Sequence, residues 1–427
     1  MVQSSPSRLA RAPGRVKLVV VLIVVPLALA GAHRGAVSWK LHHARAEMQR
    51  GDFAAALVTL ESADRWPPRR AETAFLLART FRRSGDLEQC EAWLKTASER
   101  GWSPQDVRAQ RHLLELQCGR FEQSQAWLTQ VLASGADDDL AEEIYEAQAK
   151  GFLRSYRLNE AVVCLRYWIE WKPNAIQPRL WLADVWERCD RWQAAADEFQ
   201  AVVDRAPDHF EARKRLAENL LTLNHVDRAY EHFQFCAERA PDDDAVALGL
   251  ARCQRRSGHP EEAEQTLARR LDASPDKTSS VEMLVELGQI AIDLRQVDRA
   301  IELLREAIGI DPAHALAHAT LAEAFRKSGR IDEANEHHAL ADQINARYSR
   351  LSKVLGQLAD TPGDADLRFK AGKLLMEQGL RAEGAAWMAT ALETDPTHGP
   401  AHEALADYFT AIGDHDRAAH HQQRSGP

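Results

Sequence analysis

The sequence predicts an all-α protein in which pairs of antiparallel helices stack along the chain. The first observation is composition: 427 residues include only 22 Gly and 17 Pro, and 45% are hydrophobic, which favours helices around a buried core. The second is a spacing of 34 residues between Pro173, Pro207, Pro241 and Pro275. A fixed period of this size is typical of stacked repeat units.

Each period contains two sets of apolar residues with helical spacing, which is the third observation. Small residues recur at two slots and would let paired helices approach closely, while large residues fill the gap between them. The proline then ends the second helix. Two consecutive periods fill these slots with Leu182, Ala183, Trp186, Ala195, Phe199 and Val202, and with Leu216, Ala217, Leu220, Ala229, Phe233 and Cys236.

These residues resemble the tetratricopeptide repeat, whose pattern of a large residue, Leu-Gly/Ala, an aromatic, Ala, Phe, Ala and Pro they match in register. The resemblance implies a right-handed superhelical α-solenoid with an inner groove lined by the first helices. About eleven helix-turn-helix units fit the chain, with starts near Val37, Ala71, Gln105, Glu142, Ile176, Phe210, Asp244, Val281, Ala315, Ala365 and Gly399.

Departures from the pattern suggest how the chain is divided. The unit at Gln105 has Arg111-His112 and the unit at Ala365 has Gly384 where the pattern calls for Leu-Gly/Ala and Ala. From Ile331 to about Leu358 there is no proline, and no glycine until Gly356, so we expect the second helix of that unit to run long, through an insertion at 349–364, until Thr361-Pro-Gly-Asp364 ends it. We therefore predict a signal or anchor at 1–36, a solenoid at 37–348, an extended helix and linker at 349–364, and a C-terminal pair of repeats at 365–427.

The charge of the first fifty residues predicts export. Up to Arg50 there are eight basic residues and one acid, Glu47, although the whole chain has a net charge of −9. Within this stretch, an uncharged apolar run at 18–32 comes directly after the basic residues that end at Lys17, an arrangement that is typical of a secretory signal peptide. As a helix this run would be about 22 Å long, shorter than the roughly 30 Å apolar core of a bilayer.

Two outcomes for this segment stay open. Cleavage would release a periplasmic or secreted protein. Continuation of the helix through 36–48 would instead keep a tilted anchor in the inner membrane, with the rest of the chain facing the periplasm. In both cases we expect an exported protein of the cell envelope, which contacts the membrane only through an uncleaved N-terminal segment.

Motifs of the common enzyme classes are absent from the sequence. It contains no Gly-x-Ser-x-Gly, His-Glu-x-x-His or Gly-x-x-x-x-Gly-Lys-Ser/Thr motif and no dinucleotide-binding fingerprint. The repeats leave no segment for a catalytic domain. We therefore predict a protein without enzymatic activity, catalytic residues or cofactors.

Histidine, aspartate and cysteine patterns have structural explanations. His314 and His318 have metal-ligand spacing, as do His398 and His402, but both pairs belong to one Asp-Pro-x-His template repeated 84 residues later, so we predict no metal site. Acidic runs at 137–139 and 242–244 precede first helices, where carboxylates cap free amides. None of the six cysteines forms a Cys-x-x-Cys pair, and we expect small buried side chains at Cys90, Cys118, Cys164, Cys189, Cys236 and Cys253.

Basic residues gather toward the C-terminal ends of the first helices. One interpretation is a basic strip along the groove, in which arginines bind an acidic or extended peptide; the other is that basic residues suit the last turn of any helix. Nucleic acid is not expected, because of export and the acidic net charge. The candidate binding residues are Arg79, Arg82, Arg83, Lys150, Arg154, Arg188, Arg252, Arg255, Arg256, Arg326 and Lys327, with Arg45 and Lys373 in similar slots.

A cluster of tryptophans lies between residues 168 and 192. Trp171, Trp181 and Trp192 fall outside the expected core slots. They are candidates for partner contacts, although packing between repeats could also absorb them.

The sequence therefore predicts a non-enzymatic scaffold whose groove binds peptide segments of partner proteins in an envelope complex. The alternative is an accessory subunit for polysaccharide synthesis, secretion or envelope assembly that contacts a glycan or peptide through the tryptophans.

Overall fold

The computed structural model describes residues 35–67, 69–135, 137–273 and 280–425, and within these ranges every regular element is a helix. None of the described helices is both long and apolar enough to cross a membrane. Residues 1–34, which hold most of the predicted signal or anchor, lie outside the described residues, as does Pro275.

The chain divides into two compact units, which end and begin at Ala147 and Gln148. The predicted division at 349–364 falls inside the second unit and stays a prediction. The first unit contains a helix at 35–49, then α2 (Phe53–Asp64), α3 (Ala71–Ser84), α4 (Leu87–Glu99), α5 (Pro104–Gln117), the short 3-10 helix η1 (Glu122–Ser124), α6 (Gln125–Ser134) and the first part of α7 (Asp138–Arg154).

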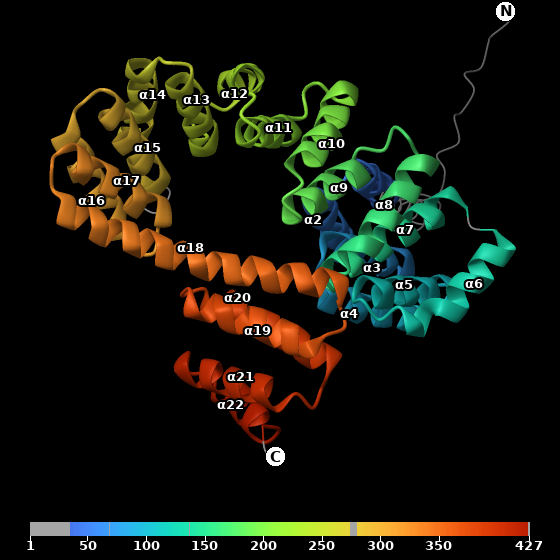
Figure 1. Ribbon diagram of the computed structural model, residues 1–427. Helices are drawn as coiled ribbons and strands as arrows, with labels where there is room; N and C mark the ends of the chain where they lie inside the picture. Colours follow the sequence, from blue (N-terminus) through green and yellow to red (C-terminus); the bar gives the residue numbers. More distant parts are fainter. Residues whose placement is uncertain (1–34, 68, 136, 274–279, 426–427) are drawn as a thin grey trace, which may run out of the picture. The chain divides into compact units, whose positions relative to one another are not determined.

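The second unit continues the series of helical hairpins (Figure 1). From α3 on, every first helix of a pair begins within four residues of the start that the repeat pattern predicts. The helices are α8 (Leu158–Trp171), α9 (Gln177–Arg188), α10 (Trp192–Arg205), α11 (Phe210–Thr222), α12 (Val226–Arg239), α13 (Asp244–Arg256), α14 (Pro260–Ala273), α15 (Ser280–Asp293), α16 (Val297–Ile310), α17 (Ala315–Lys327), α18 (Ile331–Asp360), α19 (Ala365–Glu377), α20 (Arg381–Thr394), α21 (Gly399–Ala411) and α22 (His415–Gln422).

Side chains before the first helices cap their free amides. The carboxylate of Asp243 accepts a hydrogen bond from the Val246 amide at 3.0 Å, and Asp137 accepts one from Leu140 at 2.8 Å. His314 and His398 do the same with Nδ1, which accepts from the amides of Ala317 and Ala401. The acidic runs and these two histidines therefore stabilise helix starts.

Large apolar residues of the second helices fill the space between neighbouring pairs. Phe199 and Phe233 are almost fully buried in one cluster with residues of α9, α11 and α13. Gly249 lies directly under the Phe233 ring, and a Cβ atom at this position would overlap the ring. The small residue in the repeat pattern thus makes room for the aromatic one.

Both departures from the repeat pattern have a packing reason. Gly384 of α20 faces Gly372 of α19, and a Cβ on either glycine would lie 2.6 Å from the other's carbonyl oxygen. These two helices are therefore closer than alanine would permit. In the unit at 105, His112 stacks on Trp127 at 4.9 Å between ring centroids and lies 3.2 Å from Ser124 Oγ, so polar contacts replace the usual small-residue packing.

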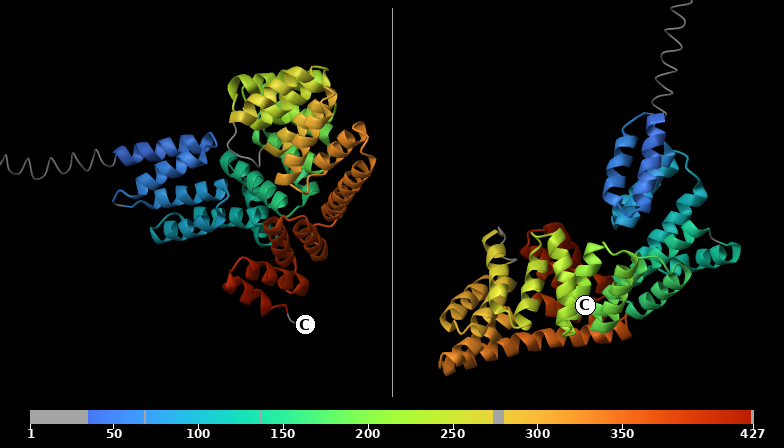
Figure 2. Two further views of the ribbon diagram at one scale, coloured as in Figure 1. Left: turned by 90° about the vertical axis from the view of Figure 1, so that its left-hand side faces the viewer. Right: turned by 90° about the horizontal axis from the view of Figure 1, so that it is seen from above.

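Helix α18 is a single helix of 30 residues, as the sequence predicts, and it changes the path of the second unit. It leaves the end of α17 and runs back across the arc of hairpins to pack against α8 (Figure 1). Tyr348 and Leu355 on its second half face Leu158 and Trp186 across a cleft of about 770 Å³. Helices α19 to α22 then form two more hairpins (Figure 2).

The C-terminal hairpins contact the start of the second unit. The buried guanidinium of Arg368 donates hydrogen bonds to the carbonyl oxygens of Pro362 and Ser155. Tyr156 packs its ring edge against Trp387 at 5.3 Å between centroids. Residues more than 200 positions apart in the sequence therefore meet, and this turn of the solenoid closes on itself.

Candidate functional site

A groove of about 670 Å³ runs along helices α11, α13 and α15 of the second unit. Buried Leu221, Leu248 and Phe233 give it an apolar lining, and Leu316 of α17 adds a side chain that is 45% exposed. The groove is lined mainly by first helices, as the resemblance to the tetratricopeptide repeat implies.

Arg252, Arg255 and Arg256, three of the candidate binding residues, all line this groove. Two of them are engaged by one buried carboxylate of the next repeat: Arg255 Nε lies 2.5 Å and Arg252 Nε 3.3 Å from the Glu286 oxygens. Arg255 also donates to Gln289 at 2.8 Å. These arginines therefore join neighbouring repeats as well as lining the groove.

Arg256 and two further acids also contribute to the net charge of the groove. Arg256 donates to the Leu221 carbonyl oxygen at 2.9 Å. Glu218 and Glu282 also line the groove, and burial raises the pKa of Glu218. With Glu286, three carboxylates oppose three guanidiniums, so the groove is close to neutral rather than a basic strip.

The predicted cations of α3 are paired with acids of α7. Arg82 is completely buried, with Nη2 2.6 Å from a Glu143 carboxylate oxygen and Nε 3.0 Å from the side-chain oxygen Oε1 of Gln110. Arg79 pairs with the same carboxylate and Arg83 with Glu146. Arg82 therefore cannot contact a partner, and its prediction as a binding residue is corrected to a structural role.

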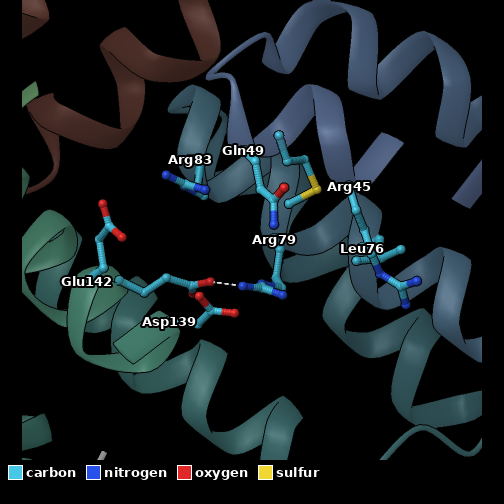
Figure 3. A pocket seen from close by; sticks show the side chains of 9 residues that line it. Arg45, Gln49, Leu76, Arg79, Arg83, Asp139 and Glu142 are labelled. Atoms are coloured by element: carbon cyan, nitrogen blue, oxygen red, sulfur yellow. Dashed lines mark hydrogen bonds and ion pairs between the residues drawn. The ribbon is translucent and has the colours of Figure 1, made fainter. Parts of the chain in front are cut away.

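Figure 3 shows a small cavity of about 270 Å³ whose lining includes Arg79, Arg83 and Glu143 of this network. Arg79 points toward the carboxylate of Glu143, and Asp139 and Glu142 lie beside it on α7. Burial raises the pKa of Glu143, but Arg82 and Arg79 outweigh that effect and hold it at about 2. The carboxylate therefore stays ionised and paired at neutral pH.

The other predicted cations lie apart from the groove or at its edges. Arg154 pairs with Glu393 at 2.8 Å, Arg188 with Asp184 at 2.8 Å, and Lys327 with Glu323 at 3.4 Å. Lys150 lies over the ring of Trp181 at 5.5 Å, and Arg326 is exposed at the end of α17. Their role in binding a partner stays a prediction.

The tryptophans are held largely by packing. Trp181 makes an edge-to-face contact with buried Trp168 at 5.8 Å, and Trp192 is half-buried. Trp171 is 36% exposed, with Lys172 over its ring at 4.5 Å. A glycan contact through Trp171, Trp181 and Trp192 stays a prediction.

Four of the six cysteines are buried as expected, but Cys118 is half-buried and Cys189 is exposed, so the expectation of a buried side chain is wrong for Cys189. All six cysteines are free thiols, and burial raises the pKa of Cys90 and Cys253 to about 12. His318 Nδ1 lies 2.9 Å from Nδ1 of His337, and the same contact recurs 84 residues later between His402 and His421. Among the described residues, no group of three or more potential ligands could hold a metal ion.

The sequence analysis did not identify the carboxylates that form ion pairs with the arginines. Glu286 follows Arg252 by 34 residues and Arg255 by 31, which is close to one repeat period. Opposite charges one period apart on first helices were therefore a usable signal. Glu143 follows Arg82 by 61 residues, so its pairing skips a repeat, and the one-period rule would not have found it.

The sequence of these stacked hairpins is similar to that of known repeat proteins. Models of the tetratricopeptide repeat match residues 47–113, 225–287 and 291–358, residues 345–425, and residues 190–234. Together they cover more than half of the chain. The protein belongs to the tetratricopeptide repeat family.

Individual relatives match only parts of the chain. The heat-shock protein cognate co-chaperone sgt12 of Aspergillus fumigatus is 29% identical over 107 residues, which are 25% of this chain and 30% of the co-chaperone. The crystal structure of TTC0263 of Thermus thermophilus is 23% identical and covers 47% of this chain and 100% of its own, with a TM-score of 0.34. YrrB, described as a tetratricopeptide repeat protein with an unusual peptide-binding site, is 18% identical and covers 48% of this chain and 94% of its own, with a TM-score of 0.28.

Proposed function

We propose that this protein is a non-enzymatic scaffold that binds a peptide segment of a partner protein in the groove of α11, α13, α15 and α17. The observation that carries this proposal is Leu316, a large apolar side chain that is 45% exposed within a groove lined by both signs of charge. An exposed apolar residue inside a concave polar surface is typical of the anchor position of a peptide site.

The composition of the groove indicates the kind of segment it accepts. Glu286 pairs with both Arg252 and Arg255, and Glu218 and Glu282 also line the groove. A purely acidic peptide therefore gains little there. A segment that packs an apolar side chain against Leu316 suits the groove better. Gln289 and Arg256 also line the groove, and their polar groups suit backbone or polar side-chain contacts of such a segment.

The experiment uses peptides selected from a library of random dodecapeptides displayed on phage, with the purified chain as the target. Affinities of the selected peptides are then measured by fluorescence anisotropy for wild type and Leu316→Asp. We expect a loss of about tenfold or more, because loss of an apolar anchor costs at least roughly 1.4 kcal/mol. Leu380→Asp is the matched control, since Leu380 is 42% exposed and does not line the groove. Equal affinities of the two variants would contradict the proposal.

We also propose that the chain is exported and acts in the cell envelope. Support comes from the sequence of residues 1–36 alone, where a basic start precedes an apolar run. A fusion of alkaline phosphatase after residue 50 should be active in bacterial cells, because that enzyme needs disulfides formed outside the cytoplasm. The same fusion without residues 2–36 should be inactive, and equal activity of both fusions would refute export.

A further inference from the structure

A second concave surface lies outside the groove, between the second half of α18 and α19. It has a volume of about 490 Å³. Its lining contains four cations, of which Arg350 and Lys353 come from α18 and Lys370 and Lys373 from α19. We call these four residues and the space between them the α18–α19 cleft.

The cations of the cleft differ from the groove arginines in their contacts. All four side chains are exposed, and within the described residues none of them forms an ion pair. Arg350 donates only to the Ala346 carbonyl oxygen of its own helix, at 3.3 Å. Glu377 is the one acid in the lining, so three positive charges remain in excess.

The base of the cleft is apolar and packed. Val354 and Leu374 line it and are 3% and 9% exposed. They belong to a core cluster with Ala371, against which Leu351 and Leu367 pack. The two rows of cations therefore lie on two helices that pack against each other through this apolar floor.

We propose that the α18–α19 cleft binds an acidic peptide segment of a partner protein, with carboxylates on both rows and an apolar side chain on the floor. Charge complementarity carries the proposal, because four cations converge without carboxylate partners on a protein whose net charge is −9. A concave site with an apolar floor suits a peptide, whereas a flat anionic lipid surface would reach only its rim. This is a second site, separate from the proposed peptide groove.

The probe is the fluorescein-labelled octapeptide Glu-Glu-Leu-Glu-Glu-Leu-Glu-Glu, whose affinity for the full chain is measured by fluorescence anisotropy. The same peptide with Gln in place of every Glu tests the role of charge and should not bind. Binding of the acidic peptide should weaken by about tenfold or more when NaCl is raised from about 50 mM to about 500 mM, because salt screens exposed charges.

The variants are Lys353→Glu/Lys370→Glu and, as a milder change, Lys353→Gln/Lys370→Gln. We expect the first to weaken binding by about a hundredfold and the second by about tenfold, since each lost contact to a carboxylate reduces affinity severalfold. Lys95→Glu/Arg108→Glu is the matched control: it changes the net charge equally at exposed positions of α4 and α5 outside the cleft. Far-UV circular dichroism checks that each variant is folded.

The outcomes separate this site from the groove. Leu316→Asp should leave binding of the octapeptide unchanged, so failure of one site does not imply failure of the other. Equal affinity of the cleft variants and the control would overturn the proposal. So would an absence of peptide binding together with binding to phosphatidylserine vesicles that the cleft variants lose, which would assign the cleft to a lipid surface.

Discussion

Replacing Arg82 with Met is expected to destabilise the first unit by up to about 3–5 kcal/mol, because the buried Glu143 carboxylate then has only the partly exposed Arg79 as an ionic partner. Arg82 is 0% exposed and bonds to Glu143, Gln110 and Gln117 from two other helices. Repeat proteins often unfold in parts. The measurement is therefore hydrogen exchange of α3 and α5, together with urea unfolding followed by circular dichroism.

Two further variants make this prediction specific. Arg82→Met/Glu143→Gln should recover part of the stability, since a neutral amide costs less to bury than a carboxylate that has lost its buried arginine partner. Arg45→Met removes an ion pair with Glu72 in which the arginine side chain is 50% exposed, and it should cost less than about 1 kcal/mol. Similar losses for Arg45→Met and Arg82→Met would mean that the buried network contributes no more than a surface ion pair.

The same network predicts how acid affects stability. The pKa of Glu143 is lowered from 4.5 to about 2, so folding favours its ionised form. Its contribution to the free energy of unfolding is complete above pH 4.5 and is lost as the pH falls toward 2. In Arg82→Met this part of the acid dependence should be shallower, because the pKa of Glu143 moves back toward its ordinary value.

The second large effect is expected where Phe233 lies on Gly249. Phe233→Ala should cost about 3–5 kcal/mol, since the ring is 1% exposed and leaves a cavity. Gly249→Ala should cost about 1–3 kcal/mol in the wild type, because the new Cβ overlaps the ring. In the Phe233→Ala background the same methyl group enters free space, and alanine is about 0.5–1 kcal/mol better than glycine in a helix.

A double-mutant cycle measures this coupling. We expect an interaction free energy of at least about 1 kcal/mol between the two positions, from urea unfolding of the four proteins. Gly309→Ala in α16 is the control, because a Cβ atom added at Gly309 would meet no other atom within 4 Å, and it should stabilise by about 0.5–1 kcal/mol. Additive effects of Phe233→Ala and Gly249→Ala would show that the two positions are not coupled, so that packing of the Phe233 ring does not depend on a glycine at position 249.

These two sites differ in how far the sequence predicts them. Phe233 occupies a slot of the repeat pattern, so its packing between helices follows from the period. Arg82 also falls in a predicted slot, but the sequence places it in the groove. Its burial depends on Glu143, which lies on a helix two repeats later, and local spacing does not show such a contact.

The amino-acid sequence by itself determined the helices, their pairing and their starts, because these depend on spacing along the chain: apolar slots, capping residues such as Asp243, and the long helix that ends at Asp360. Only the tertiary structure decided which charges are neutralised and where the second unit closes. Glu286 reaches Arg255 across one repeat interface, and Arg368 reaches Ser155 across the solenoid. The physical reason is that an ion pair or a hydrogen bond depends on distance in space, which stacking sets through the summed rotations of many hairpins.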